Sequence, residues 1–171
     1  LWDKDLNKIN ELKKDSIIEE CHQSLRRLGV EVINLYQIHW PVPDADLEQA
    51  WEAIVQLIQQ GKIRYAGVSN CTKSQLERIT AIHPPASLQP PYSMLQRGIE
   101  QELVGYCRER RIGILAYSPM HKGLLTGKFT RQYLENLPAD DHRKSKDLNF
   151  KEPRFSRNLE AIEKLKNIAA E

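Results

Sequence analysis

Short apolar segments alternate with helical segments along this chain, and that alternation constrains the fold more than any other feature. The apolar segments are rich in β-branched and aromatic residues, which is typical of buried strands. The expected strands lie within residues 32–39, 63–68, 86–91 and 113–118. The expected helices cover residues 16–28, 46–60, 72–83, 99–110 and 159–170. Such an alternation indicates a parallel sheet covered by helices, so the sequence predicts an α/β fold.

Local signals mark where several of these helices begin and end. Ser16 with Glu19, and Thr72 with Gln75, match the capping box, in which each side chain caps a backbone donor of the other residue. Gly29 is expected to end the first helix. These signals therefore predict helix starts at residues 16 and 72.

Residues 130–157 are charged and show no clear period. We expect this segment to be a long, irregular excursion on the surface.

The length and composition suit one domain with a real core. The chain has 171 residues, and we expect residues 1–171 to form a single domain. The net charge of +2 is near balance, so neither a nucleic-acid partner nor a membrane surface is indicated. The first residues do not resemble a signal peptide, and no apolar run approaches the roughly 20 residues of a membrane span.

Cysteine and histidine spacing gives no support for a metal site. The cysteines form no C-x-x-C pair, and the histidines show no H-x-x-x-H spacing. A sparse, odd number of cysteines fits a reducing compartment, so we expect a cytoplasmic protein.

Polar or aromatic residues stand at the carboxyl end of each expected strand. In chain order they are His39, Trp40, Ser69, Asn70, Gln89, Tyr92, Tyr117 and Ser118. Ligand sites of parallel α/β folds lie beyond these strand ends. Amides can bind a carboxamide or a sugar, an aromatic ring can stack on a flat heterocycle, and an imidazole can donate to a carbonyl oxygen. Each residue alone has a local explanation, such as a core histidine or a helix N-cap, but four successive strand ends predict a shared ligand site.

Six motifs in this sequence resemble those of the aldo-keto reductases, in the same order and across nearly the whole chain. They are YQIHWP (36–41), GKIR (61–64), GVSN (67–70), QPPY (89–92), LAYSP (115–119) and GLLTGK (123–128). The resemblance implies part of a (β/α)8 TIM barrel, with this chain forming about four parallel strands that correspond to strands four to seven. It also implies a cytosolic, NADPH-dependent oxidoreductase that reduces aldehydes or ketones to alcohols by hydride transfer, without a metal.

The resemblance also implies a role for individual residues. His39 would be the catalytic histidine that orients and polarises the substrate carbonyl, and Trp40 would line the substrate pocket. The nicotinamide would be held through its carboxamide and its ring by Ser69, Asn70, Gln89 and Tyr117. The pyrophosphate would be contacted by Ser118, Leu124, Gly127 and Lys128.

The sequence departs from the family in its catalytic residues. Of the family's Asp, Tyr, Lys and His tetrad, only the histidine has a counterpart, because Tyr36 and Lys62 fall within other motifs. Loss of a general acid costs on the order of 10²–10⁴ in rate. We therefore expect this chain by itself to have little or no reductase activity.

Four strands do not close a barrel, so two interpretations stay open. The chain is part of a longer enzyme, or it is a half-barrel whose open edges need a partner, such as a second copy. A non-catalytic regulatory or interaction subunit of the same fold is the alternative function. The sequence contains no G-x-G-x-x-G motif and no nucleophile elbow, which argues against a Rossmann dinucleotide site and a serine hydrolase.

Overall fold

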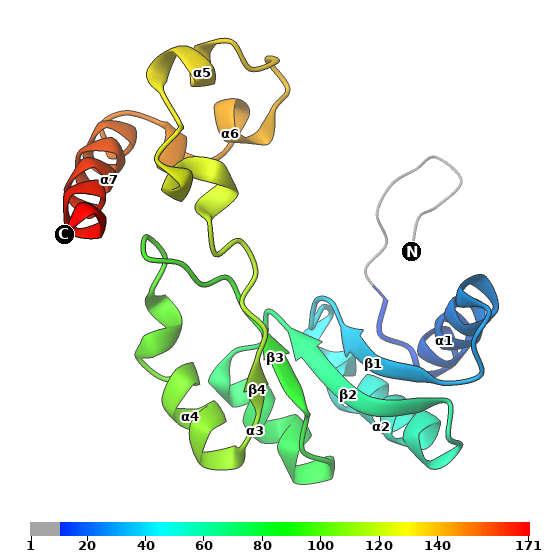
Figure 1. Ribbon diagram of the computed structural model, residues 1–171. Helices are drawn as coiled ribbons and strands as arrows, with labels where there is room; N and C mark the ends of the chain where they lie inside the picture. Colours follow the sequence, from blue (N-terminus) through cyan, green and yellow to red (C-terminus); the bar gives the residue numbers. More distant parts are fainter. Residues whose placement is uncertain (1–10) are drawn as a thin grey trace. The chain divides into compact units, whose positions relative to one another are not determined.

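A computed structural model describes residues 11–171, and four of its strands form one parallel sheet (Figure 1). The strands are β1 (Ile33–Ile38), β2 (Ile63–Ser69), β3 (Ser87–Gln89) and β4 (Gly113–Ile114), and they lie side by side in that order. Every neighbouring pair is parallel. The predicted α/β fold with four parallel strands is confirmed.

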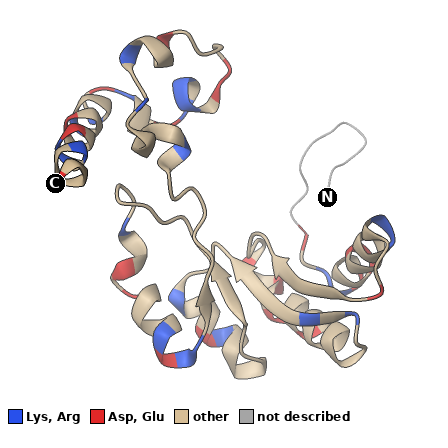
Figure 2. Cartoon of the chain, viewed as in Figure 1, with Lys and Arg blue, Asp and Glu red and all other residues tan. Residues whose placement is uncertain are grey.

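Helices precede and separate these strands. They are α1 (Lys14–Leu28), α2 (Leu47–Gln59), α3 (Lys73–Ile82) and α4 (Leu103–Arg110). Short 3-10 turns, Asp44–Asp46 and Gly98–Glu100, come before α2 and α4. Most charged residues lie on helices and loops, whereas Arg64 is the one charged residue of the strands (Figure 2).

One face of the sheet packs against the helices and forms the core. Alternate strand residues point to this face, among them Ile38, Ala66, Val68 and Leu88, which are all buried. Trp51 of α2 is fully buried in the same core. Its indole nitrogen Nε1 donates a 2.8 Å hydrogen bond to the carbonyl of His83, which satisfies the polar group that burial would otherwise leave unpaired.

The opposite face of the sheet carries a polar row near the carboxyl ends of the strands. In the register of the ladders, Gln37 stands beside Gly67, and Gly67 stands beside Ser87. One step further along, Ser69 stands beside Gln89. This face and this end of the sheet position the candidate site.

The first helix begins earlier than the capping box at Ser16 predicts. Helix α1 starts at Lys14, and its N-cap Lys13 makes no side-chain cap. Ser16 lies inside the first turn, where its hydroxyl donates to the Glu20 carboxylate over 3.2 Å instead of capping the backbone. The second predicted capping box, Thr72 with Gln75, is confirmed with both hydrogen bonds in place.

The fourth strand is shorter than predicted, and prolines explain the difference. The expected strand covered residues 113–118, but the ladder ends at Ile114. The backbone N–H of Tyr117 still donates to the carbonyl of Pro90 at 3.0 Å. Pro90 and Pro91 have no backbone N–H and cannot donate hydrogen bonds to the fourth strand. The pairing is therefore reduced to an isolated bridge between Pro91 and Tyr117.

The chain divides into two compact units. The sheet unit extends to Pro91 and also contains Gly98–Tyr117, and the helical unit consists of Tyr92–Arg97 and Ser118–Glu171. The helical unit contains a 3-10 segment (His121–Thr126), α5 (Arg131–Glu135), α6 (His142–Ser145), a second 3-10 turn (Leu148–Phe150) and α7 (Arg154–Ala170). That residues 1–171 form a single domain stays a prediction.

The helical unit has an aromatic core that the charged sequence of residues 130–157 conceals. Phe129 lies 5.0 Å from Phe150 and 6.1 Å from Phe155, measured between ring centroids, and Leu124 and Ile162 complete the buried cluster. Residues 130–157 are mostly exposed, as expected, but they are not irregular throughout. The sequence pattern did not indicate Phe150 and Phe155 as core residues, because the aromatic residues of this core are too far apart in sequence to form a periodic pattern.

Among the described residues, no helix has the length and apolar character needed to cross a membrane.

Candidate functional site

The predicted catalytic histidine follows the last residue of β1. His39 and Trp40 are both exposed, and their ring centroids are 5.7 Å apart. The carbonyl oxygen of His39 accepts a 3.0 Å hydrogen bond from Nδ2 of Asn70. The end of β2 therefore fixes the backbone that carries the imidazole.

Asn70 links three of the predicted site residues. It adopts a left-handed backbone conformation with φ of 60°, which asparagine tolerates better than most residues. Its Nδ2 donates to the His39 carbonyl and, at 3.0 Å, to Oγ of Ser69. Its Oδ1 accepts from the Tyr117 hydroxyl at 2.9 Å. Both amide hydrogens of Asn70 are thus engaged, and only Oδ1 keeps a lone pair for a ligand.

Ser69 joins the ends of β2 and β3. Its side chain is buried, and its hydroxyl donates a 2.7 Å hydrogen bond to the carbonyl of Gln89. The backbone N–H of Asn70 donates to the same carbonyl at 3.1 Å. Ser69 therefore links the ends of β2 and β3 beneath the candidate site. Both of these contacts use the Gln89 backbone, so the Gln89 side chain can make other contacts.

A polar bridge crosses the sheet beside Gln89, and the sequence reasoning missed it. Ser87 Oγ donates to Gln37 Oε1 at 2.9 Å, and Gln37 Nε2 lies 3.5 Å from Gln89 Oε1, at the outer limit of a hydrogen bond. Gln37 is on β1 and its two partners are on β3, so the bridge passes over Gly67 of β2. A glycine inside a strand pattern was the available signal, since it often marks a close approach.

Tyr117 presents its ring beside these amides. The ring is partly buried, and the hydroxyl contact with Asn70 is the only hydrogen bond that fixes the phenol among the described residues. The sheet unit thus brings together His39, Trp40, Ser69, Asn70, Gln89 and Tyr117. This set offers an imidazole, an amide and a flat ring, which suits a ligand with a flat amide-bearing heterocycle.

The remaining predicted residues belong to the helical unit. They are Ser118, Leu124, Gly127 and Lys128. Leu124 is fully buried in the aromatic core, so only its backbone is available to a ligand. Gly127 has a φ of 70°, and a Cβ there would lie 2.7 Å from Cε of Lys166. The Lys166 side chain can move aside, so it is mainly the left-handed backbone conformation that favours glycine at position 127.

Lys128 lines a cavity of about 250 Å³ within the helical unit. Arg143 lines the same cavity, but Asp141 binds its guanidinium at 2.8 Å and largely neutralises it. The Lys128 ammonium makes no ion pair with any residue in the described part of the chain. An uncompensated cation beside exposed backbone suits an anionic group such as a phosphate.

Burial raises the pKa of two ionisable groups in the core of the sheet unit. Burial raises the pKa of the Cys71 thiol, which follows Asn70, to about 12. Burial also raises the pKa of the Tyr36 phenol well above its ordinary value. A protonated thiol is a poor nucleophile, so covalent cysteine catalysis is disfavoured here.

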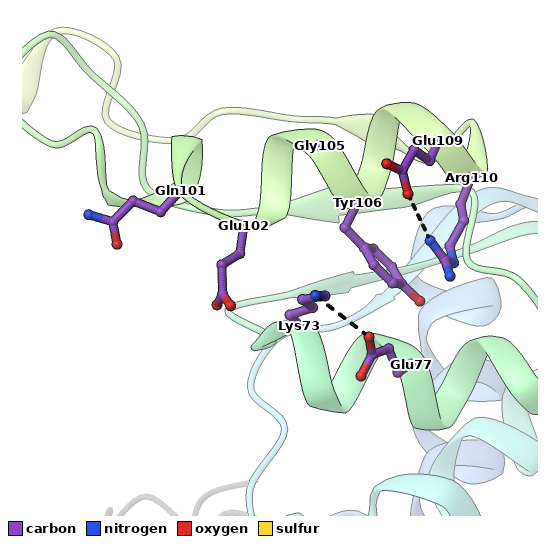
Figure 3. Close-up of a pocket in the computed structure, with 8 residues that line it drawn as sticks. All are labelled: Lys73, Glu77, Gln101, Glu102, Gly105, Tyr106, Glu109 and Arg110. Carbon is purple, nitrogen blue, oxygen red and sulfur yellow. Dashed lines mark hydrogen bonds and ion pairs between the residues drawn. The ribbon is translucent and has the colours of Figure 1, made fainter.

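A second cavity, of about 400 Å³, lies between α3 and α4 (Figure 3). Its charges are largely paired within the groove, Lys73 with Glu77 at 3.9 Å and Arg110 with Glu109 at 3.5 Å. The Tyr106 ring lies under the Arg110 guanidinium, 4.0 Å from its carbon. None of the strand-end residues lines this groove, so it is separate from the candidate site.

Comparison with known proteins gives a family for this chain. The model of the aldo/keto reductase family matches residues 3–171. Aldo-keto reductase YhdN of Bacillus subtilis is 39% identical over 153 residues, which is 90% of this chain and 45% of that protein. The Schizosaccharomyces pombe aldo-keto reductase yakc [NADP(+)] is 33% identical over 158 residues, 91% of this chain and 46% of its own length. The chain thus spans about half the length of these curated relatives.

Solved structures give the same result for the fold. The glycerol dehydrogenase AKR11B4 from Gluconobacter oxydans matches 98% of this chain and 50% of its own, with a TM-score of 0.90 and 34% identity. An aldo/keto reductase from Klebsiella pneumoniae, solved in complex with NADP and acetate, matches 74% of this chain with a TM-score of 0.59 and 27% identity. The four parallel strands and their helices are therefore part of the TIM barrel of such reductases.

Proposed function

Because this chain belongs to the aldo/keto reductase family, we propose that its strand ends bind the nicotinamide half of NADPH in an oxidoreductase that reduces aldehydes or ketones to alcohols. The observation that carries the proposal is the grouping of His39, Asn70, Gln89 and Tyr117 at one end of the parallel sheet. NADPH would supply the hydride. The chain's own residues would hold the ring and orient the substrate carbonyl.

The donor set fits the amide-bearing ring of nicotinamide. The Gln89 amide would bind the carboxamide, and Asn70 would contribute only the remaining acceptor capacity of Oδ1, because Tyr117, His39 and Ser69 engage the rest of its amide. Tyr117 would place its ring against the nicotinamide, a contact worth about 0.5–1.5 kcal/mol beyond the area it buries. Relatives that are named for NADP or solved with it support this cofactor.

His39 would act on the substrate. An imidazole N–H can donate a hydrogen bond to the carbonyl oxygen and polarise it, and the exposed position of His39 lets a ligand reach the ring. Trp40, whose ring lies beside that of His39, would form part of the substrate pocket. The family's tyrosine, lysine and aspartate have no counterparts in this chain, so we propose full reductase activity only for a protein that also contains them.

The helical unit would bind the pyrophosphate. Lys128 offers a cation without a partner among the described residues, and Ser118 and Gly127 offer backbone groups in left-handed conformations. Backbone N–H groups at left-handed residues can point towards a bound anion. A cytoplasmic location belongs to the same proposal, and the three buried free cysteines are consistent with it.

A fluorescence titration with NADPH tests the proposed function. The wild-type protein should bind NADPH with a saturable change in nucleotide emission. Replacement of Gln89 by leucine should weaken binding about two- to tenfold, as expected for the loss of one hydrogen bond. The matched control Gln49→Leu changes an exposed glutamine of α2 and should leave the affinity unchanged. Absence of saturable binding, or equal affinities for wild type and Gln89→Leu, would refute the proposal.

A further inference from the structure

The bridge from Ser87 to Gln37 to Gln89 has a direction. The Ser87 hydroxyl donates to Gln37 Oε1, so the other end of the Gln37 amide, Nε2, is turned towards Gln89. That donor faces Gln89 Oε1 over 3.5 Å, at the outer limit of a hydrogen bond. The Gln89 amide therefore turns its acceptor towards Gln37 and its donor, Nε2, the other way.

Gly67 makes this bridge geometrically feasible. Gln37 and Ser87 lie on strands that do not neighbour each other, with β2 between them. A Cβ on residue 67 would collide with Ser87 Oγ and lie 2.7 Å from Gln37 Oε1. The glycine thus leaves the space through which one side chain reaches the other.

Gln89 Nε2 is the amide donor that remains for a ligand at this end of the sheet. Asn70 already donates both of its amide hydrogens, one to the His39 carbonyl and one to the Ser69 hydroxyl. Gln37 directs its donor at Gln89 itself. Gln89 Nε2 makes no hydrogen bond with any residue in the described part of the chain and is not among the buried unpaired atoms, so a ligand can meet it.

We infer that Gln37 is a positioning residue, which through its bridge to Ser87 sets the Gln89 amide so that Nε2 donates to the carbonyl oxygen of the ring carboxamide. This inference rests on the proposed function for the identity of the ligand. The orientation of Gln89 itself rests only on contacts within the sheet unit. Gln37 acts through Gln89 and needs no contact with the cofactor.

The affinities of two nucleotides distinguish the two possible orientations of the Gln89 amide. The carboxamide of NADP⁺ has both an acceptor oxygen and a donor NH2, so rotation lets it pair with either end of the Gln89 amide. The 3-acetylpyridine analogue of NADP⁺ has only the acceptor oxygen. It can therefore pair with Gln89 Nε2 but not with Gln89 Oε1. Both nucleotides carry the same charge, so a new charge in the protein cancels from the ratio of their dissociation constants.

Gln37→Glu reverses the direction of the bridge. A carboxylate only accepts hydrogen bonds, so it should draw Gln89 Nε2 towards itself and turn Gln89 Oε1 to the ligand. The ratio of the analogue's Kd to that of NADP⁺ should rise about five- to tenfold over the wild type, because two acceptors then face each other. Gln37→Met leaves Gln89 free to turn and should change the ratio by less than Gln37→Glu does.

Gln49→Glu is the matched control, since it makes the same chemical change on the exposed surface of α2. It should keep the wild-type ratio. An unchanged ratio in Gln37→Glu, with both nucleotides still bound, would overturn the inference.

A measurement without ligand keeps the inference separate from the proposed function. The side-chain amide signals of Gln89, assigned by their loss in Gln89→Leu, should shift and become protected from solvent exchange in Gln37→Glu. Unshifted signals would overturn the positioning role on their own. Failure of the wild type to bind either nucleotide would refute the proposed function, and the amide signals would still decide the orientation of Gln89.

Discussion

Replacement of Gly67 by alanine should destabilise the sheet unit through its effect on one polar bridge. The new methyl group would occupy the space where the Ser87 hydroxyl approaches the Gln37 amide. Both neighbours are ends of side chains and can rotate away, so the sheet backbone is expected to stay in place. The cost is then the loss of the bridge together with some overpacking.

The expected magnitude follows from three opposing contributions. Loss of a neutral hydrogen bond costs about 0.5–1.5 kcal/mol. Overpacking of a buried site costs about 1–3 kcal/mol, and side-chain rotation should keep this term near its lower limit. Alanine also reduces the conformational freedom of the unfolded chain, which stabilises the folded protein by about 0.4–1 kcal/mol. We therefore expect Gly67→Ala to lower the free energy of unfolding by about 1–2 kcal/mol.

The effect of Gly67→Ala on the free energy of unfolding should change sign when the bridge residues are removed first. In a Gln37→Ala, Ser87→Ala background, neither colliding side-chain atom remains, so only the effect on the unfolded chain is left. Gly67→Ala should then be neutral or stabilising by up to about 1 kcal/mol.

Urea unfolding followed by tryptophan emission measures these changes in the sheet unit. Trp51 is fully buried there, and the helical unit contains no tryptophan. Gly105→Ala is the control, because a Cβ in the middle of α4 meets nothing within 4 Å and should stabilise the helix by about 0.5–1 kcal/mol. Equal costs of Gly67→Ala with and without the bridge residues would refute the reasoning.

Three further changes test other parts of the account. Tyr117→Phe keeps the ring but removes the hydrogen bond to Asn70, so it should lower the free energy of unfolding by about 1 kcal/mol in the same urea assay, and no change would contradict that contact. Phe150→Ala empties part of the aromatic core and should cost about 3–5 kcal/mol, measured as loss of helical circular dichroism on heating; an unchanged Tm would argue against that core. Burial lowers the pKa of His121, so the unfolded state binds the proton more readily and stability should fall as pH drops below about 6.5. An NMR titration midpoint of the His121 ring at or above 6.5 would contradict this assignment.

The order of helices and strands could be predicted because local patterns of apolar residues determine it. Apolar residues at helical spacing on α2, and short apolar runs in β1 and β2, need no knowledge of the rest of the chain. The ends of elements were less predictable. Ser16 has the sequence of a cap but lies inside α1, and β4 stops early because Pro90 and Pro91 on the neighbouring segment have no N–H.

The candidate site could be predicted as a set of strand ends but not as a network. The alternation of side chains along a strand puts Gln37 on the same face as His39, yet no local pattern shows that Gln37 reaches Ser87 fifty residues away. That contact depends on the register of three strands and on a glycine between them. The aromatic core of the helical unit was missed for a related reason, since Phe129 and Phe155 meet only after the chain folds.

The most direct test of the proposed cofactor site is an NMR map of the amide signals that shift when NADPH is added. The account predicts that the backbone N–H of Asn70 and the side-chain amide of Gln89 shift in step with saturation, while the groove around Tyr106 and Glu109 does not respond. Shifts confined to that groove, or no shift at the ends of β2 and β3 at saturating NADPH, would contradict the central claim.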